Sequence, residues 1–144
     1  MGATALNLYL LGGACLLWAV VYPQFGEAGP ELPALHASVT GHLRLAFIVP
    51  ELLSFFAMVP LLWRRPEGVP AWPAWVAVGL GLAYFAITFG WHLPAHGRLA
   101  RGDASAEVMG ALMTSHAVRT VTVALRCGAL LWMASVAGWA RAGG

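Results

Sequence analysis

Four long apolar stretches, divided by short segments that hold most of the prolines and charges, limit what this 144-residue sequence can fold into. A helix of about 20 apolar residues crosses the hydrocarbon core of a bilayer, where backbone polar groups must bond within the chain. The stretches predict helices over about residues 4–22, 34–63, 74–96 and 106–140. The predicted fold class is all-α, an integral membrane four-helix up-down-up-down bundle that forms one domain over residues 1–144.

The composition supports this class. The chain is 60% hydrophobic and only 10% charged, whereas soluble domains contain about 25% charged residues. The formal net charge of +2 is too small to indicate nucleic-acid binding. Cys15 and Cys127 lie in apolar stretches without a CxxC motif and are interpreted as small buried hydrophobic residues. The first stretch has no basic residue before it and no small-residue cleavage site after it, so we expect it to stay as a transmembrane helix.

Arginine placement predicts the orientation in the membrane. Arg64 and Arg65 lie in the connection after the second stretch, and Arg141 follows the fourth. Positively charged connections stay in the cytoplasm. We therefore expect a multi-pass protein of the bacterial cytoplasmic (inner) membrane with both termini inside (N-in/C-in).

All five histidines fall at the opposite, outer (periplasmic) face. At about 1.5 Å of rise per residue, His42 and His36 lie about 33 and 42 Å from Arg64. His92 and His96 lie about 30 and 36 Å from Trp72, and His116 lies about 37 Å from Arg141. Any one of them, taken alone, fits an interfacial polar group. Together they predict a shared metal or cofactor site, with these candidate ligands: His36, His42, His92, His96 and His116.

Charged side chains occur at two depths beneath this face. Arg44 and Arg119 lie about 30 to 33 Å from the arginine-rich end, and Glu51 and Arg126 lie about 19 and 22 Å from it. An unpaired charge at the deeper level is costly. We therefore predict a buried structural pair between Glu51 and Arg126. Pro50, inside the second helix, should kink it and free a backbone carbonyl.

The residue types leave several chemistries open. Neutral imidazole binds iron, copper and zinc, and two histidines can hold a haem. Arg44 and Arg119 are candidates for binding the acids of a cofactor, or an anionic or quinone-like substrate. Alternatively, these arginines only join helices. The sequence contains no HExxH motif, nucleophile elbow, P-loop or dinucleotide fingerprint.

Three segments resemble a known group of proteins. They are His36 with Pro50–Glu51, the run Leu93–Gly102, and Thr114–Thr120 followed by Arg126 and Leu130–Met133. Together they are similar to small bacterial four-helix membrane proteins of unknown function, which are distantly similar to the anthrone-oxygenase-like membrane proteins. The resemblance covers about residues 36–133. It implies that the positions of His36, Pro94, His96, Arg119 and Arg126 recur in that group. His42, His92 and His116 depart from its pattern, which has Gln at the position of His92 and Trp at that of His116.

Two functions follow as hypotheses. The first is a membrane redox protein, an oxidoreductase or oxygenase-like enzyme, with a histidine-lined metal or haem site at the outer face that acts on a hydrophobic substrate. The second is a non-catalytic accessory or assembly subunit of a larger membrane complex, because glycine-rich helices pack laterally against neighbours. The partners expected are the lipid bilayer, other membrane subunits or a second copy, and a hydrophobic small molecule. A carrier for a small apolar or anionic molecule is a weaker third hypothesis.

Overall fold

The computed structural model describes the backbone of residues 2–142 and the side chains of residues 2–138 except residue 44. Within this part the chain is helical, without a strand. The α-helices are α1 (Gly2–Leu16), α2 (Tyr22–Glu27), α3 (Leu32–Met58), α4 (Trp72–Ile87), α5 (Leu93–Leu99) and α6 (Ala106–Ala142). Two π-helical turns, η1 (Leu17–Val21) and η4 (Thr88–His92), and two 3₁₀ turns, η2 (Gly29–Glu31) and η3 (Val59–Leu62), connect them.

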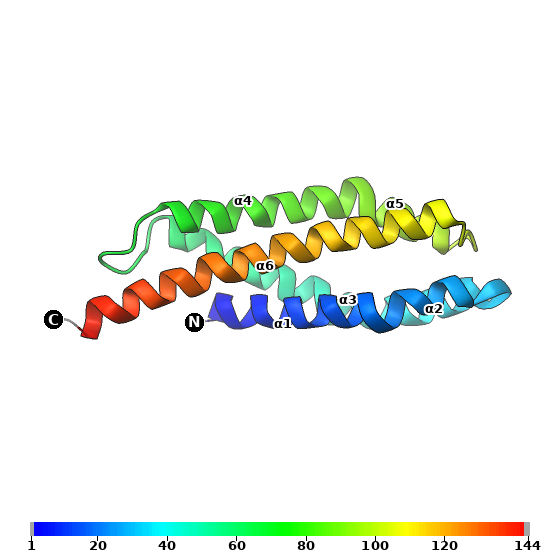
Figure 1. Ribbon diagram of the computed structural model, residues 1–144, viewed down its shortest axis with the longest axis horizontal. Helices are drawn as coiled ribbons and strands as arrows, with labels where there is room; N and C mark the ends of the chain where they lie inside the picture. Colours follow the sequence, from blue (N-terminus) through cyan, green and yellow to red (C-terminus); the bar gives the residue numbers. More distant parts are fainter. Residues whose placement is uncertain (1, 143–144) are drawn as a thin grey trace.

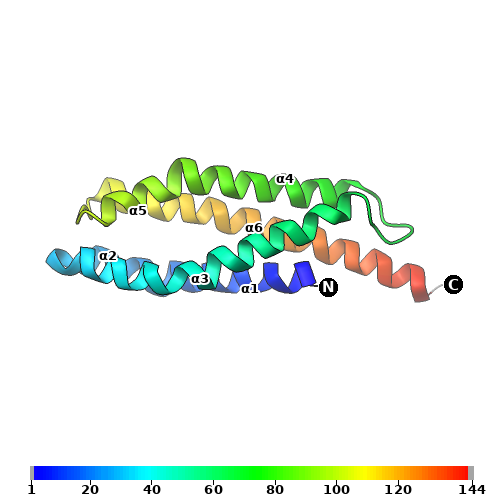
Figure 2. The same ribbon diagram turned by 180° about the vertical axis from the view of Figure 1, so that it is seen from behind.

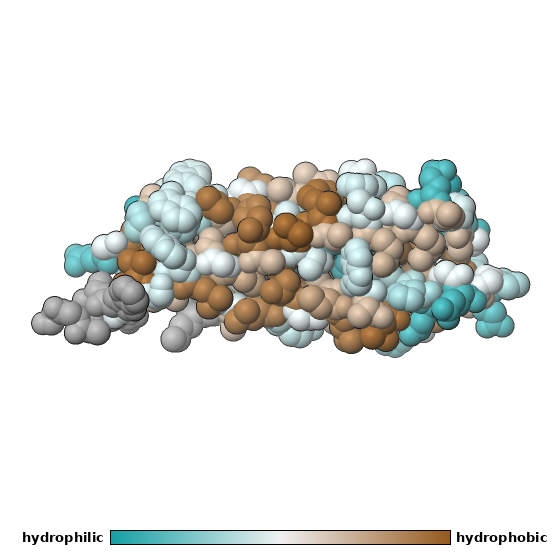
Figure 3. Space-filling model, viewed as in Figure 1, coloured by the Kyte–Doolittle hydropathy of each residue, from teal (hydrophilic) through white to brown (hydrophobic). Residues whose placement is uncertain are grey.

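Four helical segments are long and apolar enough to cross a membrane: Gly2–Glu27, Leu45–Leu62, Trp72–Leu99 and Ala106–Gly138. Figure 1 shows them as one elongated molecule, with the loop between η3 and α4 at the same end as the C-terminus. The α2–α3 turn and the α5–α6 loop lie at the opposite end. The surface over the middle of the molecule is mostly hydrophobic, and polar residues gather toward the ends (Figure 3). This distribution is typical of a protein surrounded by lipid.

The first and third helical segments extend further than the sequence predicts. We expected them to end at about residues 22 and 96, but they reach Glu27 and Leu99. In each segment a π-helical turn comes directly before an X–Pro step, Tyr22–Pro23 in one and Leu93–Pro94 in the other. Each proline occupies the first turn of the following α-helix, where a missing N–H is tolerated. The π-turns therefore let both segments continue through a proline.

Pro50 lies inside α3, as expected, and the helix continues past it to Met58. A proline at this position cannot donate to the carbonyl four residues earlier, which belongs to Ala46. The hydroxyl of Tyr9 on α1 donates to that carbonyl at 3.0 Å. The carbonyl that Pro50 frees is therefore used to join α1 to α3.

Buried side chains form three apolar layers along the molecule. The layer at the arginine-rich end includes Met58 and Met133, and the middle layer includes Leu10 and Val123. The layer at the histidine end comprises Leu17, Tyr22, Phe25, Leu32, Ala95, Leu99, Val108 and Leu112. Helix α6 packs against both α1 and α4, and Figure 2 shows it behind α3. The fold thereby brings residues of α1, α3, α4 and α6 together around one interior.

Candidate functional site

Four histidines and a tyrosine join at the histidine end through direct contacts between side chains. His36 Nε2 lies 2.9 Å from His96 Nδ1, and His96 Nε2 lies 3.2 Å from His92 Nε2. The Tyr22 hydroxyl lies 3.4 Å from His92 Nε2 and 3.2 Å from His116 Nδ1. We call Tyr22, His36, His92, His96 and His116 the histidine network. Its members come from α2, α3, η4, α5 and α6, so only the tertiary fold assembles it.

The outer partners of the network indicate which nitrogens hold protons. His116 Nε2 lies 2.8 Å from the Ala14 carbonyl, which can only accept. The Ser115 hydroxyl donates to the Leu112 carbonyl and therefore accepts from His92 Nδ1 at 2.8 Å. His92 Nε2 and His116 Nδ1 are then left as acceptors, because a neutral imidazole has one donor and one acceptor nitrogen. His92 Nε2 accepts a hydrogen bond from His96 Nε2. The Tyr22 hydroxyl has one proton, which it donates to His116 Nδ1, so its 3.4 Å approach to His92 Nε2 is a contact without a proton between the two atoms.

Local structure explains why these rings meet. His92 ends the π-turn η4, and His96 lies one turn further along α5. Pro94 lies between the two histidines, and a break of the helix there would have separated the two rings. Because the π-turn lets the helix continue past the proline, His92 and His96 stay on one face, with ring centroids 4.7 Å apart. Tyr22 directly follows the other π-turn. Such π-turns are frequent at functional sites.

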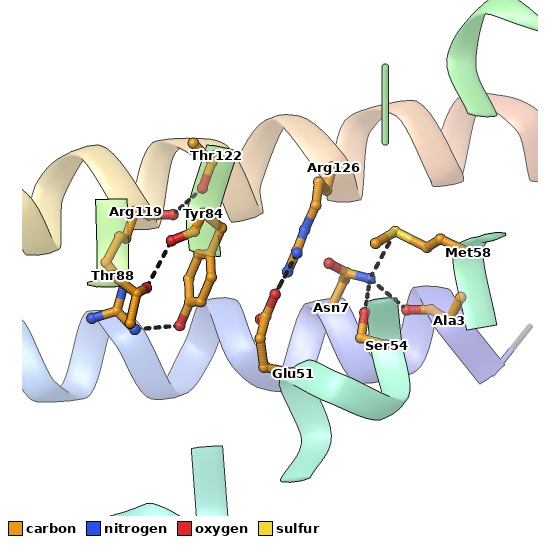
Figure 4. A network of polar contacts seen from close by, with 10 residues as sticks. All are labelled: Ala3, Asn7, Glu51, Ser54, Met58, Tyr84, Thr88, Arg119, Thr122 and Arg126. Carbon is orange, nitrogen blue, oxygen red and sulfur yellow. Dashed lines mark hydrogen bonds and ion pairs between the residues drawn. The ribbon is translucent and has the colours of Figure 1, made fainter. Parts of the chain in front are cut away.

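Beneath the network, two arginines lie on either side of one tyrosine ring (Figure 4). Arg126 donates to both carboxylate oxygens of Glu51, at 2.5 and 3.0 Å, so the pair predicted from depth is present. The guanidinium carbons of Arg119 and Arg126 lie 4.5 and 5.5 Å from the centroid of Tyr84. Arg119 also donates to the Tyr84 hydroxyl. Cation–π contacts of this kind stabilise buried guanidinium groups.

Arg119 differs from Arg126 in having no acidic partner. Among the described side chains, the ion pairs are Arg126 with Glu51 and Arg98 with Asp103 and Glu107. The Nε atom of Arg119, like that of Arg126, is buried and has no hydrogen-bond partner in the described part of the chain. Arg119 is thus a cation inside the apolar span that, among the described side chains, bonds to the phenol of Tyr84 and to no carboxylate.

A cavity of about 150 Å³ lies between Arg119 and the histidine network. Tyr22, His92, His96 and His116 line one side of it, and Arg119 and Tyr84 line another. The remaining wall is mostly apolar. It is formed by Leu10, Ala14, Leu17, Thr40, Leu43, Phe47, Ile48, Leu93, Thr120 and Val123. An apolar cavity with a few convergent polar groups is the usual form of a small-molecule site.

Not every predicted residue joins this site. His42 is exposed, and its Nδ1 lies 2.7 Å from the Ser38 carbonyl of its own helix. It therefore stays apart from the other four histidines, because it occupies a different face of α3. The side chain of Arg44, predicted with Arg119 to bind acids, lies outside the described residues.

The described donors do not fit a metal ion or a haem. No group of three or more His, Cys, Asp or Glu side chains among the described residues could hold a metal ion. The 3.2 Å between His92 Nε2 and His96 Nε2 suits two ligands of one tetrahedral ion, which lie about 3.3 Å apart. However, a protein zinc site has three or four protein ligands, and no third described donor joins these two. Axial nitrogens on opposite sides of an iron would be about 4 Å apart, more than the 2.9 Å between His36 and His96.

Sequence reasoning missed Tyr22 and Tyr84, which it connected neither to the histidines nor to the arginines. The X–Pro step is one signal that could have found Tyr22, because Tyr22–Pro23 and Leu93–Pro94 occupy matching positions at the histidine end.

We compared the chain with protein-family models, with curated proteins and with solved structures, and none of the three comparisons found a match. The resemblance to small bacterial four-helix membrane proteins therefore stays a prediction.

Proposed function

We propose that this protein binds a hydrophobic small molecule that carries an anionic oxygen head group, such as a carboxylate or a phenolate. The head group binds to Arg119, and the adjoining apolar part occupies the cavity. The single observation that carries this proposal is the lack of any acidic partner for Arg119 among the described side chains, beside a mostly apolar cavity.

The charge balance of the interior supports an anionic ligand. Arg119 and Arg126 share the interior with only one carboxylate, that of Glu51. A charge within the hydrocarbon region costs several kcal/mol unless it is paired. The remaining carboxylates lie at or beside the connecting segments: Glu27, Glu31, Glu67, Asp103 and Glu107. An anion beside Arg119 would neutralise the excess positive charge.

The histidine network supports proton-coupled chemistry on such a ligand. Four of its rings, those of Tyr22, His92, His96 and His116, line the cavity, and a neutral imidazole can both donate and accept a proton. A phenol-like ligand that transfers its proton to these rings fits the resemblance to anthrone-oxygenase-like proteins. A resident metal or haem is not part of this proposal, because the described donors do not match one.

We also propose the placement of the molecule in the membrane. The four spans alternate in direction as an up-down bundle in a bacterial inner membrane, with both termini inside. At the end with the histidines, Arg98 donates to Asp103 at 2.9 Å and to Glu107 at 2.6 Å. Hydrogen bonds from Ser105, followed by the bond from Arg98, hold the pKa of Asp103 below its usual value. Counted by arginines, Arg64, Arg65 and Arg141 at the other end exceed Arg98 and Arg101 at this one, which favours the η3–α4 connection as the one inside.

Binding of cis-parinarate, a fluorescent carboxylate that accepts energy from tryptophan, tests the proposed function. We expect the purified protein in detergent to bind it and Arg119→Gln to weaken binding about tenfold or more, since hydrogen bonds to charged groups contribute about 1.5–3 kcal/mol. The methyl ester of the probe lacks the charge and should bind equally to both proteins. Arg101→Gln, at an exposed loop position, is the matched control. Equal affinity of the wild type and Arg119→Gln for parinarate would refute the proposal.

A further inference from the structure

We infer that the ligand enters and leaves the cavity sideways from the lipid, through an opening between α3 and the η4–α5 segment bordered by Ile48 and Leu93. This inference rests on the proposed function, since it concerns the route to the same cavity. It identifies the source of the ligand as the bilayer and not the water outside the membrane.

The histidine end of the cavity is closed to water. Five side chains, at most 1% exposed, form an apolar layer there: Phe25, Leu32, Leu99, Val108 and Leu112. The contact between His36 and His96 joins α3 to α5 at the same level. A ligand that entered from the outer aqueous side would have to separate this layer.

The opposite end is closed as well. The Glu51–Arg126 pair spans the interior beneath Tyr84. Phe47 packs directly on Gly13, where an added Cβ atom would come within 2.5 Å of the ring. Leu10 and Val123 are 2% exposed and complete this floor. The cavity therefore does not continue toward the arginine-rich end.

The side between α3 and α5 differs from both ends. Ile48 and Leu93 line the cavity, yet they are 54% and 48% exposed on the outer surface. Helix α3 contacts α4 toward one end and α5 at the His36–His96 contact, and α6 lies behind it (Figure 2). Both residues belong to membrane-crossing segments, so the surface that they share faces lipid. The same two side chains thus border the cavity and the bilayer.

The size of the cavity agrees with a lateral opening. About 150 Å³ is smaller than the roughly 300–1,000 Å³ of a site that encloses a drug-sized ligand. A hydrophobic acid can place its head group at Arg119 while its tail extends between α3 and α5 into the acyl chains.

Stopped-flow energy transfer from tryptophan to cis-parinarate, with the protein in phosphatidylcholine vesicles, tests this route. We expect Leu93→Phe and Ile48→Phe to narrow the opening and to slow association and dissociation severalfold while the affinity stays the same. The double variant Ile48→Ala with Leu93→Ala should accelerate both rates. Leu125→Phe, at a comparably exposed position of α6 (55%), is the matched control and should keep the wild-type rates.

The outcomes separate the two proposals. The wild type can bind parinarate with the expected dependence on Arg119 while the variants that narrow or widen the opening keep the wild-type association and dissociation rates. In that case the lateral route is wrong and the binding function stands. If the wild type binds no parinarate, the proposed function fails first. Leu99→Ala opens the apolar layer at the histidine end. If it accelerates association while the Ile48 and Leu93 variants have no effect, the ligand enters from water.

Discussion

Arg126 is fully buried, and its environment shows how one chain can place a guanidinium within an apolar span. Glu51 accepts two hydrogen bonds from it, and the ring of Tyr84 lies beside it. Bidentate geometry makes such a pair stronger than a single contact between charges. Arg119 has the same tyrosine but no carboxylate, so the two arginines carry different functions in our interpretation. Arg126 holds helices together, and Arg119 binds a ligand.

The Glu51–Arg126 pair provides a prediction at the residue scale. Replacing Glu51 by Gln leaves an unpaired buried cation and should destabilise the protein by about 3–5 kcal/mol. The double variant Glu51→Leu with Arg126→Leu should recover most of that loss, because it removes both buried charges. Thermal unfolding of the detergent-purified proteins measures this, with the exposed Glu67→Gln as control. Equal melting temperatures for Glu51→Gln and the wild type would contradict the prediction.

At the scale of helices, two glycines determine how closely neighbouring elements approach. Phe47 of α3 lies against Gly13 of α1, and Phe55 of α3 lies against Gly81 of α4. A Cβ atom at Gly81 would come within 2.7 Å of the Phe55 ring. Gly12 and Gly79, in the same two helices, have no such neighbour within 4 Å among the described atoms. Helix α3 is therefore held on both sides by an aromatic ring seated on a glycine.

Gly81→Ala tests this contact. We expect the alanine to displace Phe55 and to cost about 1–3 kcal/mol of stability, the usual range for overpacking. Gly79→Ala, two residues earlier in the same helix, should be neutral or slightly stabilising because alanine favours helix more than glycine does. The two melting temperatures in one detergent give the comparison. A Gly81→Ala protein as stable as Gly79→Ala would show that α3 and α4 do not depend on this close approach.

At the scale of the whole molecule, the distribution of charge between the two ends supports one orientation. Arg64 and Arg65 connect the second and third spans, whereas carboxylates outnumber arginines in the connections at the histidine end. Because cytoplasmic connections are enriched in arginine, the histidine network should lie toward the periplasm and the η3–α4 loop toward the cytoplasm.

Cysteine labelling in intact bacteria checks this orientation. In a background with Cys15→Ala and Cys127→Ala, a membrane-impermeant maleimide should label Glu31→Cys without lysis. It should label Glu67→Cys only after the cells are opened. Both positions are exposed, so accessibility within the fold does not limit either reaction. The reverse pattern would mean that the termini face outward and that the site opens toward the cytoplasmic leaflet.

The sequence by itself determined the class of this protein and the depth of its polar groups. Helices in lipid must satisfy their own backbone, so apolar length predicts them. A constant rise per residue then placed the histidines at one end and Glu51 at the level of Arg126. For this reason the pair could be predicted before any contact was known.

Only the tertiary structure decided which polar groups meet. Depth along a helix contains no information on how neighbouring helices are rotated about their axes. The turn of about 100° per residue already puts His42 on a different face from His36, but only the packing shows which other rings His36 meets. The two π-turns shift the register of the residues that follow, and they carry both segments past a proline. They thereby bring Tyr22, His92 and His96 together. Whether Arg119 has an acidic partner among the described side chains is likewise decided by packing, because it depends on the position of each carboxylate in the folded protein.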